Sequence, residues 1–256
     1  MLSLSLCRLI NVSQMEKKTM KKPMPTSCEQ CPSRAEGIFC GLESEELKEI
    51  AQHKVINRYK KGQTLFVQGT HPYGLYCVSN GNIKLTKTDS SGKESIVKVV
   101  SGGDIIGHRS LFTDSNYSAT ATALDETEVC FIDKKFIMKV IAEKPTVSFS
   151  IINKLSRDMG AAEEKISSFH QKNVRERLAE LLLLLRQSHG EMMTDGRVKI
   201  NLKLTREEMA TMIGTANETL IRFITEFKDA GLIEQEGKTL FIIDEETLIE
   251  WANLSL

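Results

Sequence analysis

Three cysteines near the N-terminus are spaced closely enough to act together on one metal. Cys28 and Cys31 are separated by two residues, and Cys40 follows after a gap of eight. Six cysteines in a cytoplasmic protein are kept reduced, so they do not indicate a disulfide framework. Grouped thiols suit a metal, and a [4Fe–4S] cluster needs four thiolates. A zinc site is less favoured, because four-cysteine zinc sites usually present two closely spaced pairs.

A second stretch, Leu204–Phe223, predicts two short helices joined by a tight turn. Thr205 with Glu208 has the spacing of a capping box, in which each side chain bonds a backbone N–H at the start of a helix. Thr215 with Glu218 repeats this spacing, so a second helix is predicted to begin there. The two helix starts lie ten residues apart.

The other residues of this stretch fit a helix-turn-helix. Gly214 falls at the turn, where glycine adopts a left-handed backbone most easily, and Ala210 is small where two helices must approach. Four apolar residues would close the core between the helices: Met209, Ile213, Leu220 and Phe223. Because the second helix of such a motif enters a DNA major groove, the pattern predicts double-stranded DNA as a partner. An ordinary helical hairpin is the alternative, since capping and an apolar stripe occur there too.

The composition of the 256 residues argues against several classes of protein. No apolar run approaches the roughly 18–20 residues of a membrane helix, and the apolar start is too short and wrongly flanked for a signal peptide. We therefore expect a cytoplasmic protein of one or two domains with no membrane partner. An enzyme is not expected, because no nucleophile–base pair or phosphate-binding loop is apparent and the five histidines lack metal-ligand spacing.

The charge of the chain does not by itself indicate a nucleic-acid partner. The net charge is zero, and from Gln171 onward eleven Lys and Arg stand against fifteen Asp and Glu, a net charge of −4. This runs against the basic surface usual in DNA-binding domains. We therefore expect weak non-specific binding, with affinity that depends on dimerisation and on base contacts.

The chain divides into four segments of different pattern. Residues 1–27 lack periodicity and are interpreted as a mobile basic tail. Residues 28–144 combine the cysteine segment with short strands punctuated by glycine, which predicts a sensor domain built as a β jelly-roll barrel. Residues 145–171 form one long helix, and residues 172–256 hold the helix-turn-helix and a hairpin that predicts a wing. The fold class is therefore α+β.

The long helix carries an apolar seam of the kind that pairs two copies of a helix. Its residues recur at alternating steps of three and four: Ile151, Leu155, Asp158 or Met159, Ala162, Ile166 and Phe169. We interpret the seam as a homodimer interface, in which the two copies of Asp158 repel each other until a signal arrives. The alternative is a helix packed on its own barrel.

A glycine-punctuated barrel, a long helix and a winged helix, in this order, resemble the CRP/FNR family of bacterial transcription regulators. The resemblance runs from Cys28 to the C-terminus, and these motifs carry it: Lys61-Gly62-Gln63-Thr64-Leu65-Phe66 with Gly69, Tyr76 with Val78 and Gly81, Gly92 with Glu94, and Gly103-Asp104 with Gly107. It implies a barrel like that of cyclic-nucleotide-binding domains, a homodimer on a palindromic DNA site, and RNA polymerase as a further partner. The chain is more similar to FNR-like members than to cyclic-AMP-binding ones.

The resemblance also implies which residues read DNA. Family members use a Glu early in the recognition helix and an Arg one turn later, and Glu218 and Arg222 hold these positions. Arg222 can donate to guanine O6 and N7, and Glu218 can accept from cytosine N4 unless the capping box occupies it. Asn217 and Thr215 are further candidates at the helix N-terminus. Ile221 stands where FNR-like members often have Ser, so the half-site should differ at one base.

For the cysteines, the resemblance implies a set of four ligands. FNR-like members add one cysteine from the barrel to three N-terminal ones, and Cys130 matches that position. A [4Fe–4S] cluster would then be held by Cys28, Cys31, Cys40 and Cys130. The gap before Cys40 is longer than the FNR spacing, so Cys40 is the weakest match. The alternative for Cys130 is a small buried apolar residue on a strand.

Cyclic AMP is not expected to bind in the usual way. Cyclic-nucleotide-binding members place a Glu on the ribose and an Arg on the phosphate, and His108 and Tyr117 occupy these positions here. A buried phosphate without its cation is costly. A haem or another small ligand would instead use a candidate pocket formed by His108, Arg109, Tyr117 and Ser118.

Three interpretations of the signal stay open. The one we favour is oxygen, redox state or nitric oxide acting through the cysteine cluster. The second is a small ligand or haem in the barrel, and the third is a regulator without an effector. A protein-interaction module that has no DNA target is the alternative from a different class.

Overall fold

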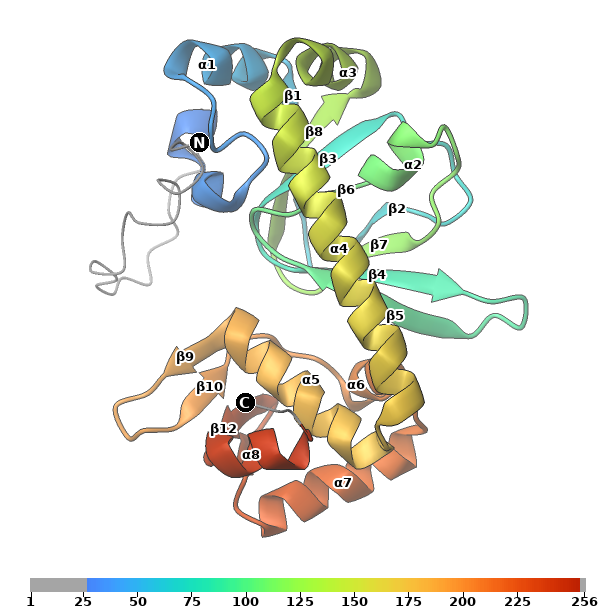
Figure 1. Ribbon diagram of the computed structural model, residues 1–256, viewed down its shortest axis with the longest axis vertical. Helices are drawn as coiled ribbons and strands as arrows, with labels where there is room; N and C mark the ends of the chain where they lie inside the picture. The colour runs from blue at the N-terminus through green and yellow to red at the C-terminus, as the bar shows by residue number, and fades with distance from the viewer. Residues whose placement is uncertain (1–26, 254–256) are drawn as a thin grey trace. The chain divides into compact units, whose positions relative to one another are not determined.

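The structure is a computed structural model that describes residues 27–253. The predicted basic tail therefore lies outside the described residues, apart from Ser27. The chain forms two compact units. Of the described residues, the first unit contains 27–85 and Val99–Leu155, and the second contains Thr86–Lys98 and 156–253. Figure 1 gives the order of the elements along the chain.

The strands of the sensor domain form two four-stranded sheets. The first sheet contains, in spatial order, β1 (Lys54–Tyr59), β8 (Thr127–Asp133), β3 (Gly74–Asn80) and β6 (Ile105–Ile106). The second contains β2 (Thr64–Phe66), β7 (Thr120–Ala123), β4 (Ile83–Thr88) and β5 (Glu94–Val100). Together with the helical segments, the sheets confirm the predicted α+β class and the β-rich sensor domain.

The first sheet separates two apolar cores, because alternate residues of a strand point to opposite faces. Tyr76 and Val78 of β3 belong to the inner core, whose buried members come from both sheets: Val78, Ile83, Val100, Ile106, Ala121 and Val129. Leu75 and Cys77 of the same strand belong to the outer core, which includes residues of the flanking helices. The inner core lies between the two sheets and fills the barrel. The outer core covers the opposite face of the first sheet.

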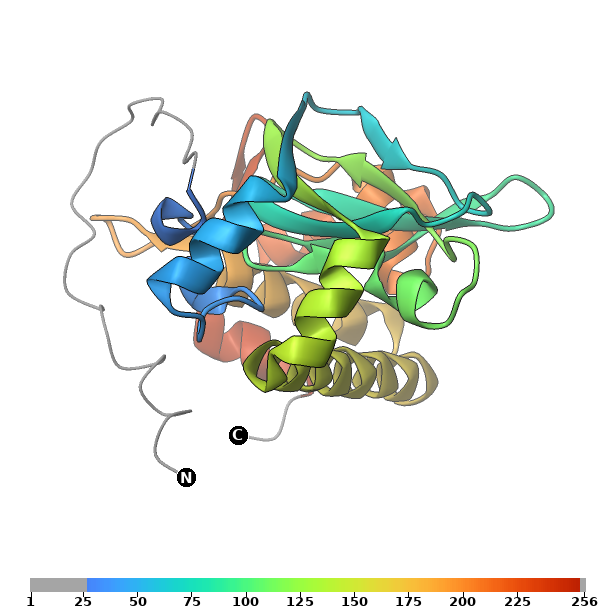
Figure 2. The same ribbon diagram turned by 90° about the horizontal axis from the view of Figure 1, so that it is seen from above.

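Helices α1 (Ser44–Gln52) and α3 (Lys134–Glu143) lie side by side over the outer face of the first sheet (Figure 1; Figure 2). The ring of His53, which ends α1, stacks on Phe136 of α3 with 3.9 Å between the ring centroids. Lys144 pairs with Glu46 at 2.6 Å.

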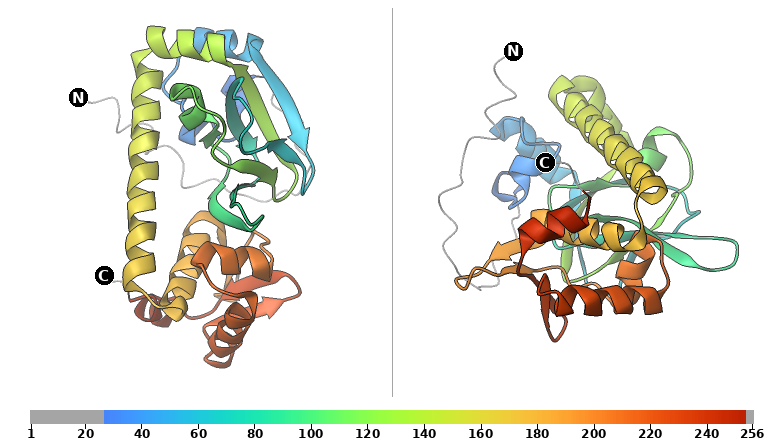
Figure 3. Two further views of the ribbon diagram at one scale, coloured as in Figure 1. Left: turned by 90° about the vertical axis from the view of Figure 1, so that its right-hand side faces the viewer. Right: turned by 60° about the horizontal axis from the view of Figure 1, so that its bottom comes forward.

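Helix α4 (Pro145–Gln171) is one continuous helix of 27 residues (Figure 3). It begins at Pro145, because proline lacks the N–H that the first residue of a helix leaves unpaired and has a φ suited to that position. Ile151 is 4% exposed and lies in the outer core, and Leu155 packs against the same core. These two residues of the predicted seam therefore pack on the sensor domain of their own chain.

The C-terminal unit contains a small sheet and the remaining helices. The sheet has the order β11 (Ile233–Glu236), β12 (Thr239–Ile242), β10 (Val198–Ile200) and β9 (Gly190–Met192). The helices are α5 (Val174–His189), α6 (Arg206–Ile213), α7 (Asn217–Asp229) and α8 (Glu245–Trp251). Strands β11 and β12 form the predicted wing, which follows α7 directly (Figure 3).

Several elements were not predicted from the sequence, among them β1, β6, β9, α8 and the short helix α2 (His108–Phe112). Strand β9 has no apolar alternation, since all three of its residues are exposed, and it is held by pairing with β10. Helices α2 and α8 span five and seven residues, which is too short for a recognisable period.

Candidate DNA interface and cysteine-lined cavity

The predicted capping box at the start of α6 is present. The Glu208 backbone N–H donates to the Thr205 hydroxyl at 3.1 Å, and the Thr205 N–H donates to the Glu208 carboxylate at 2.8 Å. Gly214 ends the helix with φ +66°, the left-handed conformation that the turn was predicted to need. Met209 and Ala210 are buried, as the predicted core requires.

The second predicted capping box is wrong. Helix α7 has Ala216 at its N-cap with no side-chain cap bond, so Thr215 stands one residue too early. The Thr215 backbone N–H instead donates to the Ala210 carbonyl at 3.0 Å, which keeps Thr215 in the turn. Glu218 is consequently not committed to a capping box, and the competing role predicted for its carboxylate is removed.

Helix α7 presents its polar residues to solvent, as a recognition helix must. Asn217, Glu218 and Arg222 are exposed, whereas Thr215 in the turn is half-buried. Glu218 and Arg222 lie four residues apart and therefore on one face of the helix. Ile221 is 46% exposed beside them, so an aliphatic side chain belongs to the same surface. Leu220, on the opposite face, is fully buried.

The turn of this motif is packed against the end of α4. A Cβ on Gly214 would lie 2.5 Å from Cε1 of Phe169, so the ring leaves no space for a side chain there. The Arg177 guanidinium lies over the same ring at 5.0 Å from its centroid. Arg177 also donates from Nε to the Ile213 carbonyl at 2.9 Å and from Nη1 to the Lys172 carbonyl at 2.6 Å.

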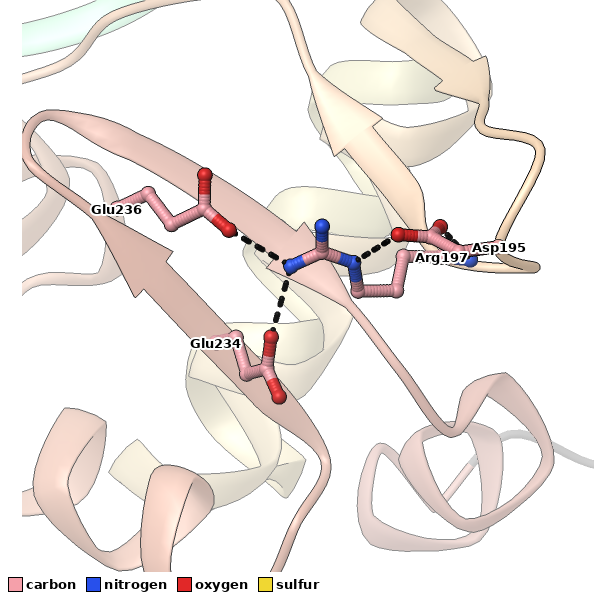
Figure 4. A network of polar contacts seen from close by, with 4 residues as sticks. All are labelled: Asp195, Arg197, Glu234 and Glu236. Atoms are coloured by element: carbon pink, nitrogen blue, oxygen red, sulfur yellow. Dashed lines mark hydrogen bonds and ion pairs between the residues drawn. The ribbon is translucent and has the colours of Figure 1, made fainter.

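Part of the negative charge of the C-terminal unit is neutralised within it. Arg197 pairs with Asp195 at 2.8 Å, Glu234 at 2.9 Å and Glu236 at 2.8 Å (Figure 4). Its guanidinium also lies 4.5 Å from the ring centroid of Phe241. Two of the three carboxylates come from β11 of the wing, and one cation against three carboxylates leaves this cluster with a net charge of −2.

The second candidate site is a cavity of about 60 Å³ on the outer face of the first sheet, with room for a few water molecules. It lies between the strands and an N-terminal segment that contains the 3-10 helices η2 (Cys28–Gln30) and η3 (Arg34–Glu36). The Ser33 hydroxyl donates to the Ser79 carbonyl at 2.8 Å and fixes this segment to β3. Four of the lining residues are cysteines: Cys28, Cys31, Cys77 and Cys130.

Burial favours the neutral form of Cys28, Cys77 and Cys130. Burial raises the pKa of Cys130 to about 11 and raises the pKa of Cys77 well above its usual value. Burial also raises the pKa of Cys28, although the positive charge of Lys54 and a hydrogen bond with it act in the opposite direction. None of the five described cysteines is in a disulfide.

The structure does not assemble the predicted ligand set. Three of its members, Cys28, Cys31 and Cys130, line the cavity, but Cys40 is not among the lining residues. Cys77, for which the sequence predicts no role, lines it instead. Among the described residues, no group of three or more His, Cys, Asp or Glu is arranged to hold a metal ion. A [4Fe–4S] cluster on the predicted set does not fit this arrangement.

The four residues of the candidate ligand pocket in the barrel differ in exposure. His108 and Tyr117 are buried, whereas Arg109 and Ser118 are exposed. The Tyr117 ring stacks on Phe66 with 3.8 Å between the centroids, and its hydroxyl bonds to that of Tyr76. Aromatic side chains thus pack where the resemblance places the phosphate-binding Arg.

Two parts of the chain match known families. Residues 56–144 match the cyclic nucleotide-binding domain, and residues 176–251 match the Crp-like helix-turn-helix domain. The transcriptional activator protein FnrL of Cereibacter sphaeroides is 31% identical over 227 residues, which cover 85% of this chain and 88% of FnrL. The chain belongs to the CRP/FNR family of transcriptional regulators. It is a DNA-binding regulator of this family and not an enzyme.

Further proteins are similar to this chain in sequence or in fold. The CRP-like cAMP-activated global transcriptional regulator of Mycobacterium tuberculosis is 26% identical over 212 residues, covering 83% of this chain and 94% of the relative. A CooA mutant from Carboxydothermus hydrogenoformans has the same fold, with a TM-score of 0.70, 24% identity, and coverage of 84% of this chain and 95% of that one. Within residues 27–253, no helix is long and apolar enough to cross a membrane.

Sequence reasoning missed several residues that the structure places at the two sites. Cys77 and Lys54 lie far from Cys28 along the chain, and only the sheet register brings them to the cavity. A signal was present for Cys77, because it alternates with apolar neighbours and so lies on the other face of β3 from them. Arg197 acts through ion pairs within the C-terminal unit that spacing alone does not reveal, and the contact of Phe169 with Gly214 differs from the seam role predicted for that residue.

Proposed function

We propose that this CRP/FNR-family regulator works as a homodimer on a two-fold-symmetric DNA site and responds to oxygen, redox state or nitric oxide at the cysteine-lined cavity. Glu218 and Arg222, exposed one turn apart on α7, carry the DNA part of the proposal. Arg222 would read guanine and Glu218 would read cytosine in the major groove. Asn217 would contact the DNA near the helix N-terminus, where backbone N–H groups favour phosphate. RNA polymerase is the further partner expected of such a regulator.

An exposed apolar face on α4 supports the homodimer. Its large side chains are 40–64% exposed and recur mainly at steps of three and seven: Phe149, Ile152, Met159, Ile166 and Phe169. A contiguous apolar face of this kind is rarely exposed to water. Pairing with the same helix of a second copy would bury it. The interface that we propose therefore contains Met159, Ala162 and Ile166, which also belong to the predicted seam. It contains Phe149 and Ile152 in place of Ile151 and Leu155.

The role proposed for Asp158 changes as well. Its carboxylate pairs with Lys98 at 2.6 Å, and both side chains are about one quarter to one third exposed. A paired carboxylate repels its copy across a dimer axis less than a lone one does. We therefore place Met159, rather than Asp158, at the centre of the dimer contact.

The proposed signal rests on the chemistry of the cavity. Four thiols share one buried space on the sensor domain, and thiols are the side chains that oxygen, nitric oxide and soft metals engage. The barrel interior, in contrast, is filled by stacked rings such as Phe66 and Tyr117. The cavity is therefore favoured over the barrel as the place where the signal acts.

A single experiment tests both parts of the proposal. Protein purified without oxygen would be titrated into a fluorescent palindromic duplex at two salt concentrations, before and after exposure to air or to a nitric oxide donor. We expect salt-dependent binding of one dimer per duplex, with an affinity that changes on exposure. A protein that ignores the duplex would contradict the DNA part, and an affinity that is the same in every atmosphere would contradict the signal.

A further inference from the structure

One amide side chain joins the wing to the first helix of the DNA-binding motif. Gln235, on β11, accepts at Oε1 a hydrogen bond from Nη2 of Arg206, the first residue of α6. Its Nε2 donates to the Gly237 carbonyl at 2.6 Å. A guanidinium can only donate and a carbonyl can only accept, so one orientation of the amide satisfies both partners. Neither a carboxylate nor an ammonium could make this pair of bonds.

The bond to Gly237 acts on the turn of the wing. Glu236 and Thr239 are paired across the hairpin, which leaves Gly237 and Lys238 as its two-residue turn. Gly237 has φ +60°, and the first residue of such a turn favours glycine for this reason. The carbonyl that Gln235 holds belongs to the peptide group between Gly237 and Lys238. The amide therefore fixes the orientation of the backbone that carries the exposed Lys238 side chain.

The acidic residues of the wing lie on the other face of its strand. Side chains alternate along β11, and Glu234 and Glu236 both reach Arg197 on one face (Figure 4). Gln235 stands between them in the sequence and so points to the opposite face, where it meets Arg206. The side chain that holds Arg206 is thus neutral, so this contact does not neutralise the positive charge of the guanidinium.

The charge that remains on Arg206 suits an anion such as a DNA phosphate. Partial burial lowers the pKa of Arg206, but a guanidinium stays charged in proteins. The loss of water also strengthens its attraction to a phosphate, because the local dielectric is lower. From Gln171 onward, Asp and Glu outnumber Lys and Arg by four, so general attraction to DNA is weak and the placement of each cation matters more.

The geometry points to Gln235 as a positioning residue for DNA binding. It holds Arg206 at the start of α6 and Lys238 on the wing at a fixed spacing, so that both reach phosphates of the same duplex. This role concerns the DNA backbone, whereas the role of Arg222 concerns the bases. The inference rests on the DNA part of the proposed function and is independent of the signal.

The salt dependence of binding gives a direct test, because Gln235 carries no charge. Each phosphate that a protein neutralises contributes about −0.9 to the slope of log K against log[salt]. Gln235→Met keeps the length of the side chain and removes the amide, so a change of slope must come from the cations that it holds. For a dimer that loses one or two contacts per protomer, the slope should become less negative by about 2–4. Between about 50 and 200 mM salt, the fall in affinity should be smaller than for the wild type by a factor of about 10–150.

Matched variants identify the cations that are involved. Gln187→Met makes the same change at an exposed position of α5 and should leave the slope unchanged. Arg206→Ala and Lys238→Ala should each make the slope less negative, and adding Gln235→Met to the variant that carries both should change it no further. Because phosphates carry no sequence information, Gln235→Met should weaken binding to specific and scrambled duplexes by the same factor.

Urea denaturation distinguishes positioning from folding. A purely structural role for Gln235 would lower the stability of Gln235→Met and leave its salt slope at the wild-type value, and Gln235→Ala repeats the measurement with a second side chain. An unchanged slope, or a loss confined to the specific duplex, would overturn the inference. The DNA part of the proposed function would survive that result if Arg222→Ala still weakens specific binding. A wild-type protein that binds no duplex would defeat both.

Discussion

Phe169 and Gly214 are in contact so close that the end of the long helix and the turn of the DNA-binding motif fit together as one piece. A Cβ at Gly214 would stand 2.5 Å from the Phe169 ring, and Gly214 also has φ +66°. Arg177 lies over the same ring and bonds to the Ile213 carbonyl. We therefore expect the last turn of α4 and the start of the recognition helix to move together.

This contact predicts that Gly214 and Phe169 are energetically coupled. Gly214→Ala should lower the free energy of unfolding by about 1–3 kcal/mol, because it adds backbone strain and a clash with the ring. In a Phe169→Ala background the clash disappears, so the same substitution should cost less by about 0.5–3 kcal/mol, the range for residues in contact. Urea denaturation of the four proteins gives this coupling, and strictly additive costs would show that the ring does not restrict the turn.

Arg222 should carry sequence specificity. Arg222→Ala is expected to weaken binding to the specific site by about 1–3 kcal/mol, and Arg222→Lys should recover only part of this because Lys cannot donate bidentately. Lys228→Ala, on the same helix, is the matched control for loss of one positive charge. Fluorescence anisotropy on specific and scrambled duplexes makes the comparison, and equal losses for Arg222→Ala and Lys228→Ala on both duplexes would count against base reading.

Ile221 should read a thymine methyl group. Its side chain is 46% exposed next to Arg222, and an aliphatic group in the major groove contacts the C5-methyl of thymine. Replacing one thymine of each half-site by deoxyuridine removes only that methyl, so wild-type affinity should fall. Ile221→Ser should bind both duplexes equally, and a wild-type protein that does not distinguish thymine from uracil at any position would refute the contact.

The buried thiols predict how stability depends on pH. Below about pH 8.5 a cysteine is protonated in the folded and unfolded chain, so Cys130 makes no pH-dependent contribution there. Between that pH and its folded pKa of about 11, the unfolded thiol ionises while the folded one does not, so the free energy of unfolding falls as pH rises. The fall is at most about 1.4 kcal/mol per pH unit for one thiol.

Replacing this thiol should flatten the alkaline slope. Urea denaturation of the metal-free wild type and of Cys130→Ala, from about pH 8 to about pH 11, separates the contribution of Cys130 from that of Lys and Tyr groups. Parallel curves for the two proteins would mean that the thiol ionises as easily in the fold as outside it.

The exposed face of α4 predicts a specific way to separate the dimer. Met159 is 64% exposed on that face, so Met159→Glu should place two carboxylates in an apolar contact and yield monomers. Ala161→Glu adds the same charge to an exposed position on the other side of the helix and should leave the dimer intact. Sedimentation velocity measures the oligomeric state, and circular dichroism confirms that each variant is folded. A Met159→Glu protein that remains dimeric would show that the interface lies elsewhere.

Local patterns were sufficient to predict the helix-turn-helix, the wing and most of the barrel strands, because capping residues, glycines and apolar alternation act over a few residues. The start of α7 was misjudged by one residue, since a Thr with a Glu three positions later occurs as readily in a turn as at an N-cap. The apolar seam on α4 is ambiguous for a similar reason. A period of three and four residues fits two adjacent faces of a helix, and only the outer core shows that Ile151 is covered by its own chain.

The cavity could be predicted only in part. Cys28 and Cys31 were indicated by their proximity along the chain, whereas Cys77 and Lys54 depend on which strands are neighbours. Sheet order is a long-range property, so no spacing rule identifies it. The one local indication was that Cys77 and Cys130 both lie on strands where apolar residues flank them and point to the barrel side.

The alternation of side chains along β3 determines how substitutions in this strand affect the regulator. Tyr76 and Val78 fill the barrel, while Cys77 between them faces the cavity. A substitution at Cys77 can therefore change the side chain that lines the cavity without changing the packing of the barrel interior. A one-residue slip of β3 would do the reverse and exchange the two sets of side chains, sending the thiol inward and the aromatic ring outward. The register of β3, which its pairing with β8 fixes, therefore determines that Cys77 faces the cavity at which we propose the signal acts.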